Sequence, residues 1–131
     1  MPLWRALQTI EQGVCRQHDL AVWDYVVLID VRDHPDTTQL DVANRIVRSP
    51  SRLVGDLDGL MQRGLLTRRR DEADRRVHRL RLSRTGASLA WRAQLDLRER
   101  EGRLLEHLTT TEQARLRQLL ARASPPMSSS A

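Results

Sequence analysis

The sequence predicts a mostly helical chain that carries one small β-hairpin, and three observations support this fold class. Its 131 residues, 40% of them hydrophobic, suit one domain with a single core. Apolar residues recur with helical spacing over most of the chain, and a strand pattern stands out only within residues 65–82. The single cysteine, Cys15, allows neither an internal disulfide nor a cysteine-based zinc module, so stability must come from apolar burial.

Two helices are predicted before the first break in the chain. Residues 20–31 are almost continuously apolar, which suits a strand or a buried helix, and their length and lack of glycine and proline favour a helix. Pro35 ends this segment because it disfavours helical geometry at the preceding residue. The earlier helix, residues 3–18, has an apolar face made of Leu3, Leu7, Ile10 and Val14.

Two short helices follow, joined by a turn. The first runs from a cap at Thr37 or Thr38 to Ile46, and the second begins at the Ser49-Pro50 pair and ends at Gly64. Helices of these lengths with such a turn have the dimensions of a helix-turn-helix. The expected inward faces are Leu40, Ala43 and Ile46 on the first helix and Leu53, Leu57 and Leu60 on the second.

A basic hairpin and two more helices complete the chain. Residues 65–70 are expected to form a strand, residues 77–82 alternate apolar and polar side chains, and a charged loop joins them. A long helix is predicted over residues 84–107, and a final one begins within residues 108–112. Residues 124–131 are a polar, low-complexity tail that we expect to be disordered.

The positive charge is concentrated around this hairpin. All 22 cationic side chains are arginine, and residues 51–85 hold 10 of them against 5 acidic residues, a net charge of +5. The rest of the chain holds 12 of each and is neutral. Such a concentration predicts contact with a polyanion, because the planar guanidinium pairs well with phosphate groups and guanine edges.

Three motifs accompany this order of elements. They are the helix-turn-helix of residues 40–60, the exit Arg63-Gly-Leu-Leu-Thr-Arg68, and the hairpin Asp71-Glu-Ala-Asp74-Arg75-Arg76 leading into Leu82-Ser-Arg-Thr-Gly86. Over about residues 20–123 the chain resembles the MarR family of bacterial winged helix-turn-helix transcription regulators. The family's wing has an Asp-x-Arg core, matched by Asp74 and Arg76, and its long helix opens with Leu-Thr-x-x-Gly, in which Ser83 replaces threonine here.

The chain departs from the family pattern at two positions. Glu72 stands where the family often has proline, and Gly55 stands where relatives often carry a polar or basic residue that contacts bases. The first change should make the tip of the wing more flexible. The second leaves few side chains for direct contact with bases.

The resemblance implies a winged helix-turn-helix with dimerisation helices at both ends. We expect one domain over residues 1–123, with the DNA-binding core at about residues 20–86 and dimerisation helices at 1–18 and 87–123. The implied function is sequence-specific binding of double-stranded DNA. The protein is expected to be an effector-released repressor in the bacterial cytoplasm that binds a pseudopalindromic operator as a homodimer.

The expected DNA contacts lie on the second short helix and on the wing. A helix entering the major groove presents its first turn to base edges, and Arg52 is the main candidate for reading a base. Its alternative role is a phosphate contact or a solvated charge. The resemblance implies that Arg76 enters the minor groove while Asp74 holds its guanidinium, with Arg75 on the DNA backbone. Further candidates are Ser49, Ser51 and Gly55 beside Arg52, and Arg45, Arg48, Arg68, Arg69, Arg70, Arg79 and Arg81 for phosphates.

The apolar faces at both ends of the chain predict pairing with a second copy. Interleaved around a two-fold axis, they would set the two DNA-binding helices about 34–36 Å apart, one turn of DNA. The alternative is that each face folds back on its own chain. The predicted dimerisation residues are Leu3, Leu7, Ile10, Val14, Leu104, Leu108, Leu116, Leu119 and Leu120.

Two other groups of side chains have both a functional and an ordinary interpretation. Trp23, Tyr25 and Trp91, with Trp4, suit a pocket for a small aromatic effector, although aromatic residues are more often plain core. Cys15 suits a redox sensor, although with only Arg16 as a basic neighbour it is more often a small buried residue. Peroxide release from DNA through Cys15 therefore stays open as an alternative form of regulation.

The sequence argues against several other classes of protein. The four histidines lack the spacing of a metal site, and no nucleophile elbow or phosphate loop appears, so we expect no metal, no cofactor and no enzymatic activity. No apolar run approaches the roughly 20 residues of a membrane span, so we expect no membrane partner. The remaining alternative is a winged-helix module that binds an acidic protein through its arginine-rich wing.

Overall fold

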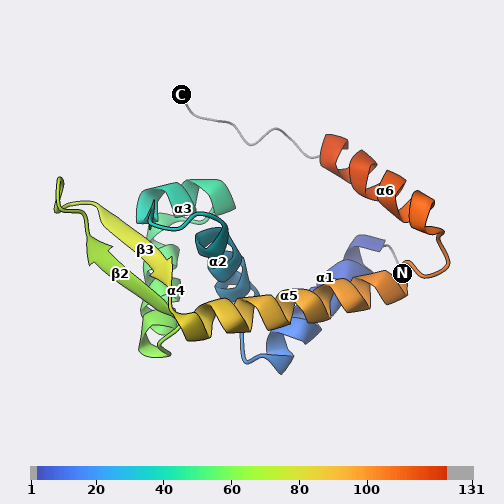
Figure 1. Ribbon diagram of the computed structural model, residues 1–131, viewed down its shortest axis with the longest axis horizontal. Helices are drawn as coiled ribbons and strands as arrows, with labels where there is room; N and C mark the ends of the chain where they lie inside the picture. Colours follow the sequence, from blue (N-terminus) through green and yellow to red (C-terminus); the bar gives the residue numbers. More distant parts are fainter. Residues whose placement is uncertain (1–2, 124–131) are drawn as a thin grey trace.

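The computed structural model describes residues 3–123, which form helices around a small sheet (Figure 1). The helices are α1 (Leu3–Gln17), α2 (Val22–Asp33), α3 (Gln39–Ile46), α4 (Pro50–Gln62), α5 (Arg84–Leu104) and α6 (Thr110–Ala123). The strands are β1 (Thr37–Thr38), β2 (Leu66–Arg70) and β3 (His78–Leu82). The predicted fold class, mostly helical with a hairpin, is confirmed. The predicted disordered tail, residues 124–131, lies outside the described residues.

The sheet is antiparallel with strand order β1-β3-β2. Strands β2 and β3 pair Leu66 with Leu82 and Arg68 with Leu80, and the three leucines of these pairs face the core. Strand β1 adds only two residues at the edge of β3, where Thr37 pairs with Leu80. The sequence did not predict this strand, because two residues are too few to show an alternating pattern.

Hydroxyl side chains cap the start of four helices, one of them Thr109, which accepts a hydrogen bond from Glu112 N at 3.1 Å at the start of α6. Thr38 caps α3 by accepting a hydrogen bond from Asp41 N at 3.1 Å, and the predicted cap of α4 is present as well, with Ser49 as the acceptor. Ser83 caps α5 by accepting from Gly86 N at 3.0 Å and donates to the carbonyl oxygen of Gly64 at 2.6 Å. The second contact ties the start of α5 to the turn that ends α4.

The core lies between α2, α4 and the sheet. Leu53, Leu57 and Leu60 form the buried face of α4, as predicted. The expected inward face of α3 is partly wrong, because Leu40 is 63% exposed and Val42 is fully buried instead. Leu40 lies in the first turn of α3, whereas Val42 and Ala43 face the core.

The first and last helices, α1 and α6, lie on the side away from the sheet (Figure 1). Helix α5 runs from the sheet along α1 toward α6, and α6 stands off from the other helices (Figure 1). Val14 and Cys15 of α1 are buried, and Leu89, Ala90 and Ala93 of α5 join the core. Helix α6 contributes no buried residue. The fold therefore separates a packed sheet-bearing part from a terminal part with an exposed helix.

Candidate nucleic-acid interface

The first turn of α4 is exposed to solvent. Ser49, Ser51 and Arg52 are all exposed, while the leucines of the same helix face the core. Gly55, one turn further, is also exposed, and a Cβ added there would meet no atom within 4 Å. Packing therefore does not require glycine at this position. The resulting surface is shallow, with Arg52 as its long side chain.

We define the wing as residues 66–82. The loop at its tip presents two arginines. Arg75 is exposed and the side chain of Arg76 is 92% exposed. Asp74 Oδ1 accepts hydrogen bonds from the backbone N–H of Arg76 at 3.1 Å and from its Nε at 3.3 Å. The carboxylate thus lies where it orients the Arg76 guanidinium while leaving most of that group in solvent.

Asp71 organises the base of this tip, a role that its place in the wing motif did not predict. Its Oδ1 accepts from the backbone N–H of Ala73 at 2.8 Å and of Asp74 at 3.1 Å. Its Oδ2 pairs with Arg79 on β3. The hydrogen bond from Arg79, followed by those from Ala73 and Asp74, lowers the pKa of Asp71 to about 2, so the carboxylate stays charged at neutral pH. An aspartate in a hairpin loop is a sequence signal of such a turn, because its carboxylate can accept from the backbone N–H two residues further on.

Asp36, in the loop between α2 and β1, holds the arginines on the outer face of the sheet. Its carboxylate accepts from Arg81 at 2.5 Å and lies 3.6 Å from Arg69, and its carbonyl oxygen accepts from Arg79 at 2.9 Å. The hydrogen bond with Arg81 lowers the pKa of Asp36. Arg79 and Arg81, predicted as phosphate contacts, are thus committed to acidic or carbonyl partners within the chain. Of the arginines on β2, Arg68 and Arg70 are exposed on the other face.

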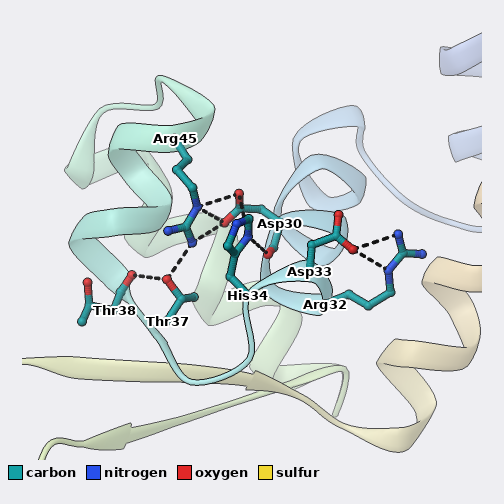
Figure 2. A network of polar contacts seen from close by, with 7 residues as sticks. All are labelled: Asp30, Arg32, Asp33, His34, Thr37, Thr38 and Arg45. Carbon is teal, nitrogen blue, oxygen red and sulfur yellow. Dashed lines mark hydrogen bonds and ion pairs between the residues drawn. The ribbon is translucent and has the colours of Figure 1, made fainter. Parts of the chain in front are cut away.

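Arg45, also predicted as a DNA contact, joins α3 to α2 (Figure 2). Its Nε and Nη2 donate to the carboxylate of Asp30 at 3.0 and 2.8 Å, and Nη2 also donates to Thr37 Oγ1 at 2.6 Å. The Asp30 side chain is only 10% exposed. The Arg45 guanidinium therefore neutralises a nearly buried carboxylate within the chain, and its contact with DNA stays a prediction.

Arg48 is likewise an internal contact rather than a free phosphate ligand. Its guanidinium donates to Asp56 at 2.8 and 3.1 Å and lies over the Trp23 ring, 4.3 Å from the centroid. The Arg48 and Asp56 side chains are 14% and 15% exposed. Trp23 therefore stacks on an arginine, which differs from its predicted place in an effector pocket.

The other predicted pocket residues lie in different surroundings. Tyr25 is buried in the core, where burial raises its pKa, whereas Trp4 and Trp91 are more than half exposed. An apolar groove of about 310 Å³ lies elsewhere, between α3, the start of α4 and the wing, and Leu40 and Val77 are among its lining residues. The predicted aromatic set does not line this groove.

Cys15 is buried within α1. Burial, together with the nearby carboxylates of Glu11 and Asp24, raises the pKa of its thiol to about 11. A protonated, inaccessible thiol reacts slowly with oxidants. These surroundings favour the ordinary interpretation of Cys15 as a small core residue.

The predicted dimerisation residues divide into two groups. Val14 is 1% exposed inside its own chain, so it cannot contact a second copy in this conformation, and that prediction is corrected. The side chain of Leu3 lies outside what the structure describes. The others keep part of their surface in solvent: Leu7, Ile10, Leu104, Leu108, Leu116, Leu119 and Leu120.

Residues 3–123 contain neither a candidate metal site nor a candidate membrane span. No group of three or more His, Cys, Asp or Glu side chains in this range could hold a metal ion. No helix within it has the length and apolar character needed to cross a membrane.

Helices α3 and α4 form a helix-turn-helix, and the hairpin of β2 and β3 that follows carries exposed arginines at its tip. These elements define the class of winged helix-turn-helix proteins. Residues 24–78 match the model of the MarR family. Among solved structures, the chain is similar to the transcriptional repressor CouR bound to a 23-mer DNA duplex, with 29% identity, a TM-score of 0.80 and coverage of 92% of this chain and 87% of that chain. The family match and the fold confirm the resemblance to the MarR family of transcriptional regulators.

Two further solved structures are similar over most of their length. A MarR-family regulator from Rhodococcus sp. RHA1 has 25% identity and a TM-score of 0.80, covering 90% of this chain and 84% of that chain. The PcaV transcriptional regulator from Streptomyces coelicolor, in complex with its natural ligand, has 27% identity and a TM-score of 0.74, covering 92% and 87%. No curated protein sequence matches the chain.

Proposed function

We propose that the protein is a transcriptional repressor that binds a specific DNA operator as a homodimer and is released by a small effector. The observation that carries this proposal is the joint exposure of Arg52 at the start of α4 and Arg76 at the wing tip. In a winged helix these two elements meet the major and the minor groove of one duplex. The DNA-bound repressor CouR has a similar fold, which supports this arrangement.

The exposed apolar surface at the ends of the chain supports the dimer. Leu119 on α6 is 44% exposed, and no residue of α6 is buried within the chain. A helix with an apolar face that its own chain does not cover gains stability by packing against a second copy. A dimer binds two half-sites one DNA turn apart, so the proposed operator is pseudopalindromic.

The proposed effector is a small aromatic molecule. The PcaV regulator was solved with its natural ligand, which supports control by a ligand in proteins of this fold. A ligand that favours a conformation with a different spacing of the two α4 helices would weaken operator binding. Because its proposed target is chromosomal DNA, we expect the protein to act in the bacterial cytoplasm.

The dependence of affinity on salt tests the DNA-binding function. If six or more phosphates are contacted, affinity for duplex DNA should fall by about a thousandfold or more between 50 and 200 mM salt. Fluorescence anisotropy with a labelled duplex measures this. Arg76→Ala should weaken binding to specific and unrelated duplexes alike, without lowering the melting temperature. A chain that binds no duplex at 50 mM salt but does bind an acidic protein would instead be an interaction module.

Light scattering tests the dimer with a matched pair of variants on α6. Leu119→Glu places a charge on the apolar face and should give monomers at micromolar concentration. Gln118→Glu adds the same charge at an exposed polar position of the same helix and should stay dimeric. If Leu119→Glu is as dimeric as the wild type, α6 does not form the interface.

A further inference from the structure

A continuous series of contacts connects the body of the protein to the arginine at the wing tip. It begins at Asp36, whose carbonyl oxygen accepts a hydrogen bond from Arg79 Nη1 at 2.9 Å. The Nε of the same guanidinium pairs with Asp71 Oδ2. Asp71 in turn accepts from the backbone of Asp74, and Asp74 accepts from Arg76. The contacts thus run without a break from Asp36 through Arg79, Asp71 and Asp74 to Arg76.

Asp71 is the central member of this series because each of its polar groups has a different role. One carboxylate oxygen shapes the turn over residues 71–74, and the other is anchored to β3 through Arg79. Its backbone N–H donates to Val77 O at 2.9 Å, which closes the hairpin. The Asp71 side chain is 15% exposed, so it is more enclosed than the tip that it supports.

We propose that Asp71 is a positioning residue for DNA binding, which holds the wing turn so that Asp74 aims Arg76 at the minor groove. This inference rests on the DNA-binding function proposed above. Asp71 does not touch DNA and acts through Arg76. Without the turn, the highly exposed Arg76 would sample many orientations, and ordering it on the minor groove would cost conformational entropy.

If Asp71 positions the wing, removing its carboxylate should weaken DNA binding. Its charge alone predicts the opposite change in affinity, so the two explanations can be separated. Removing a carboxylate near DNA lowers its repulsion of the phosphates and should strengthen binding. Glu72, the next residue, is exposed at the same tip and carries the same charge. Asp71→Ala and Glu72→Ala therefore change the net charge equally, but only the first removes the contacts that shape the wing.

The experiment measures duplex affinity and minor-groove protection for these variants. Asp71→Ala should weaken binding several-fold and lose hydroxyl-radical protection at the wing site, while Glu72→Ala should bind as tightly as the wild type or more tightly. Asp71→Asn keeps an acceptor for the two turn amides but loses the pairing with Arg79, so its loss should be smaller. Melting temperatures show whether each variant is folded, and Asp71→Asn carries the test if Asp71→Ala is not.

A double variant separates positioning from a direct role. Because Asp71 acts through Arg76, the Asp71→Ala/Arg76→Ala protein should bind DNA no more weakly than Arg76→Ala alone. Additive losses, or an Asp71→Ala variant that binds like Glu72→Ala, would overturn the proposal. If Arg76→Ala itself leaves DNA affinity unchanged, the wing has no part in the proposed DNA binding. That outcome contradicts the proposed function and can be told apart from a failure of the positioning role of Asp71 alone.

Discussion

The guanidinium of Arg48 lies 4.3 Å from the centroid of the Trp23 ring and forms two hydrogen bonds with Asp56. This contact joins three places: the first turn of α2, the turn of the helix-turn-helix, and the middle of α4. Arg45 makes a second such connection, from α3 to Asp30 on α2. The helix that we expect to enter the major groove is therefore held in place by arginines whose guanidinium groups already pair with carboxylates of the chain.

Arg48→Ala should lower the free energy of unfolding by about 2 kcal/mol, because Asp56 loses a charge-assisted partner and the stack on Trp23 is lost. Urea denaturation at neutral pH measures this. The slope of DNA affinity against salt should stay unchanged, whereas Arg75→Ala, at the exposed wing, should reduce that slope by about one unit. A variant with normal stability and a reduced slope would make Arg48 a phosphate contact after all.

Arg52→Ala should flatten base preference at one position in each half-site. A bidentate arginine contact with guanine contributes about 1–3 kcal/mol of discrimination against other bases. The Arg52 side chain is exposed, so the melting temperature should not change. Selection from a library of randomised operators measures the preference. An unchanged profile with weaker overall affinity would show that Arg52 contacts phosphate instead.

Cys15 should resist peroxide and thiol reagents in the folded protein and react once the protein is unfolded. Its pKa is raised from 9.0 to about 11, so the unfolded state loses the thiol proton first as the pH rises. The stability that this group contributes is present below pH 9 and is lost between pH 9 and 11. Denaturation curves across this range, compared with Cys15→Ala, test the second statement. Rapid native oxidation that releases DNA would restore the redox alternative.

Gly86→Ala should destabilise the fold by about 3 kcal/mol or more, because its Cβ would overlap the backbone of Leu65. Gly102→Ala, further along α5, has open space around its Cβ and should stabilise the helix by about 0.5–1 kcal/mol. Thermal denaturation of the two variants gives the comparison. Equal effects would mean that the close approach of α5 to Leu65 is not required.

Local signals in the sequence predicted most elements of the fold. The caps at Ser49 and Ser83 and the apolar face of α4 are confirmed, because capping and helical periodicity depend on residues within a few positions of each other. The two-residue strand β1 was missed, and Leu40 was placed inward although it is exposed. Both features depend on the distant parts of the chain that pack against residues 37–46, and the local sequence does not specify those partners.

The sequence by itself determined where the helices and the hairpin begin, that positive charge gathers around the hairpin, and that the chain resembles the MarR family. Only the tertiary structure decided which arginines remain available. Asp30 and Arg45 are 15 residues apart, and Asp36 and Arg81 are 45 apart, yet each pair is joined by hydrogen bonds. An arginine's charge is visible in the sequence, but whether an acidic partner has already neutralised it depends on distances that exist only after folding.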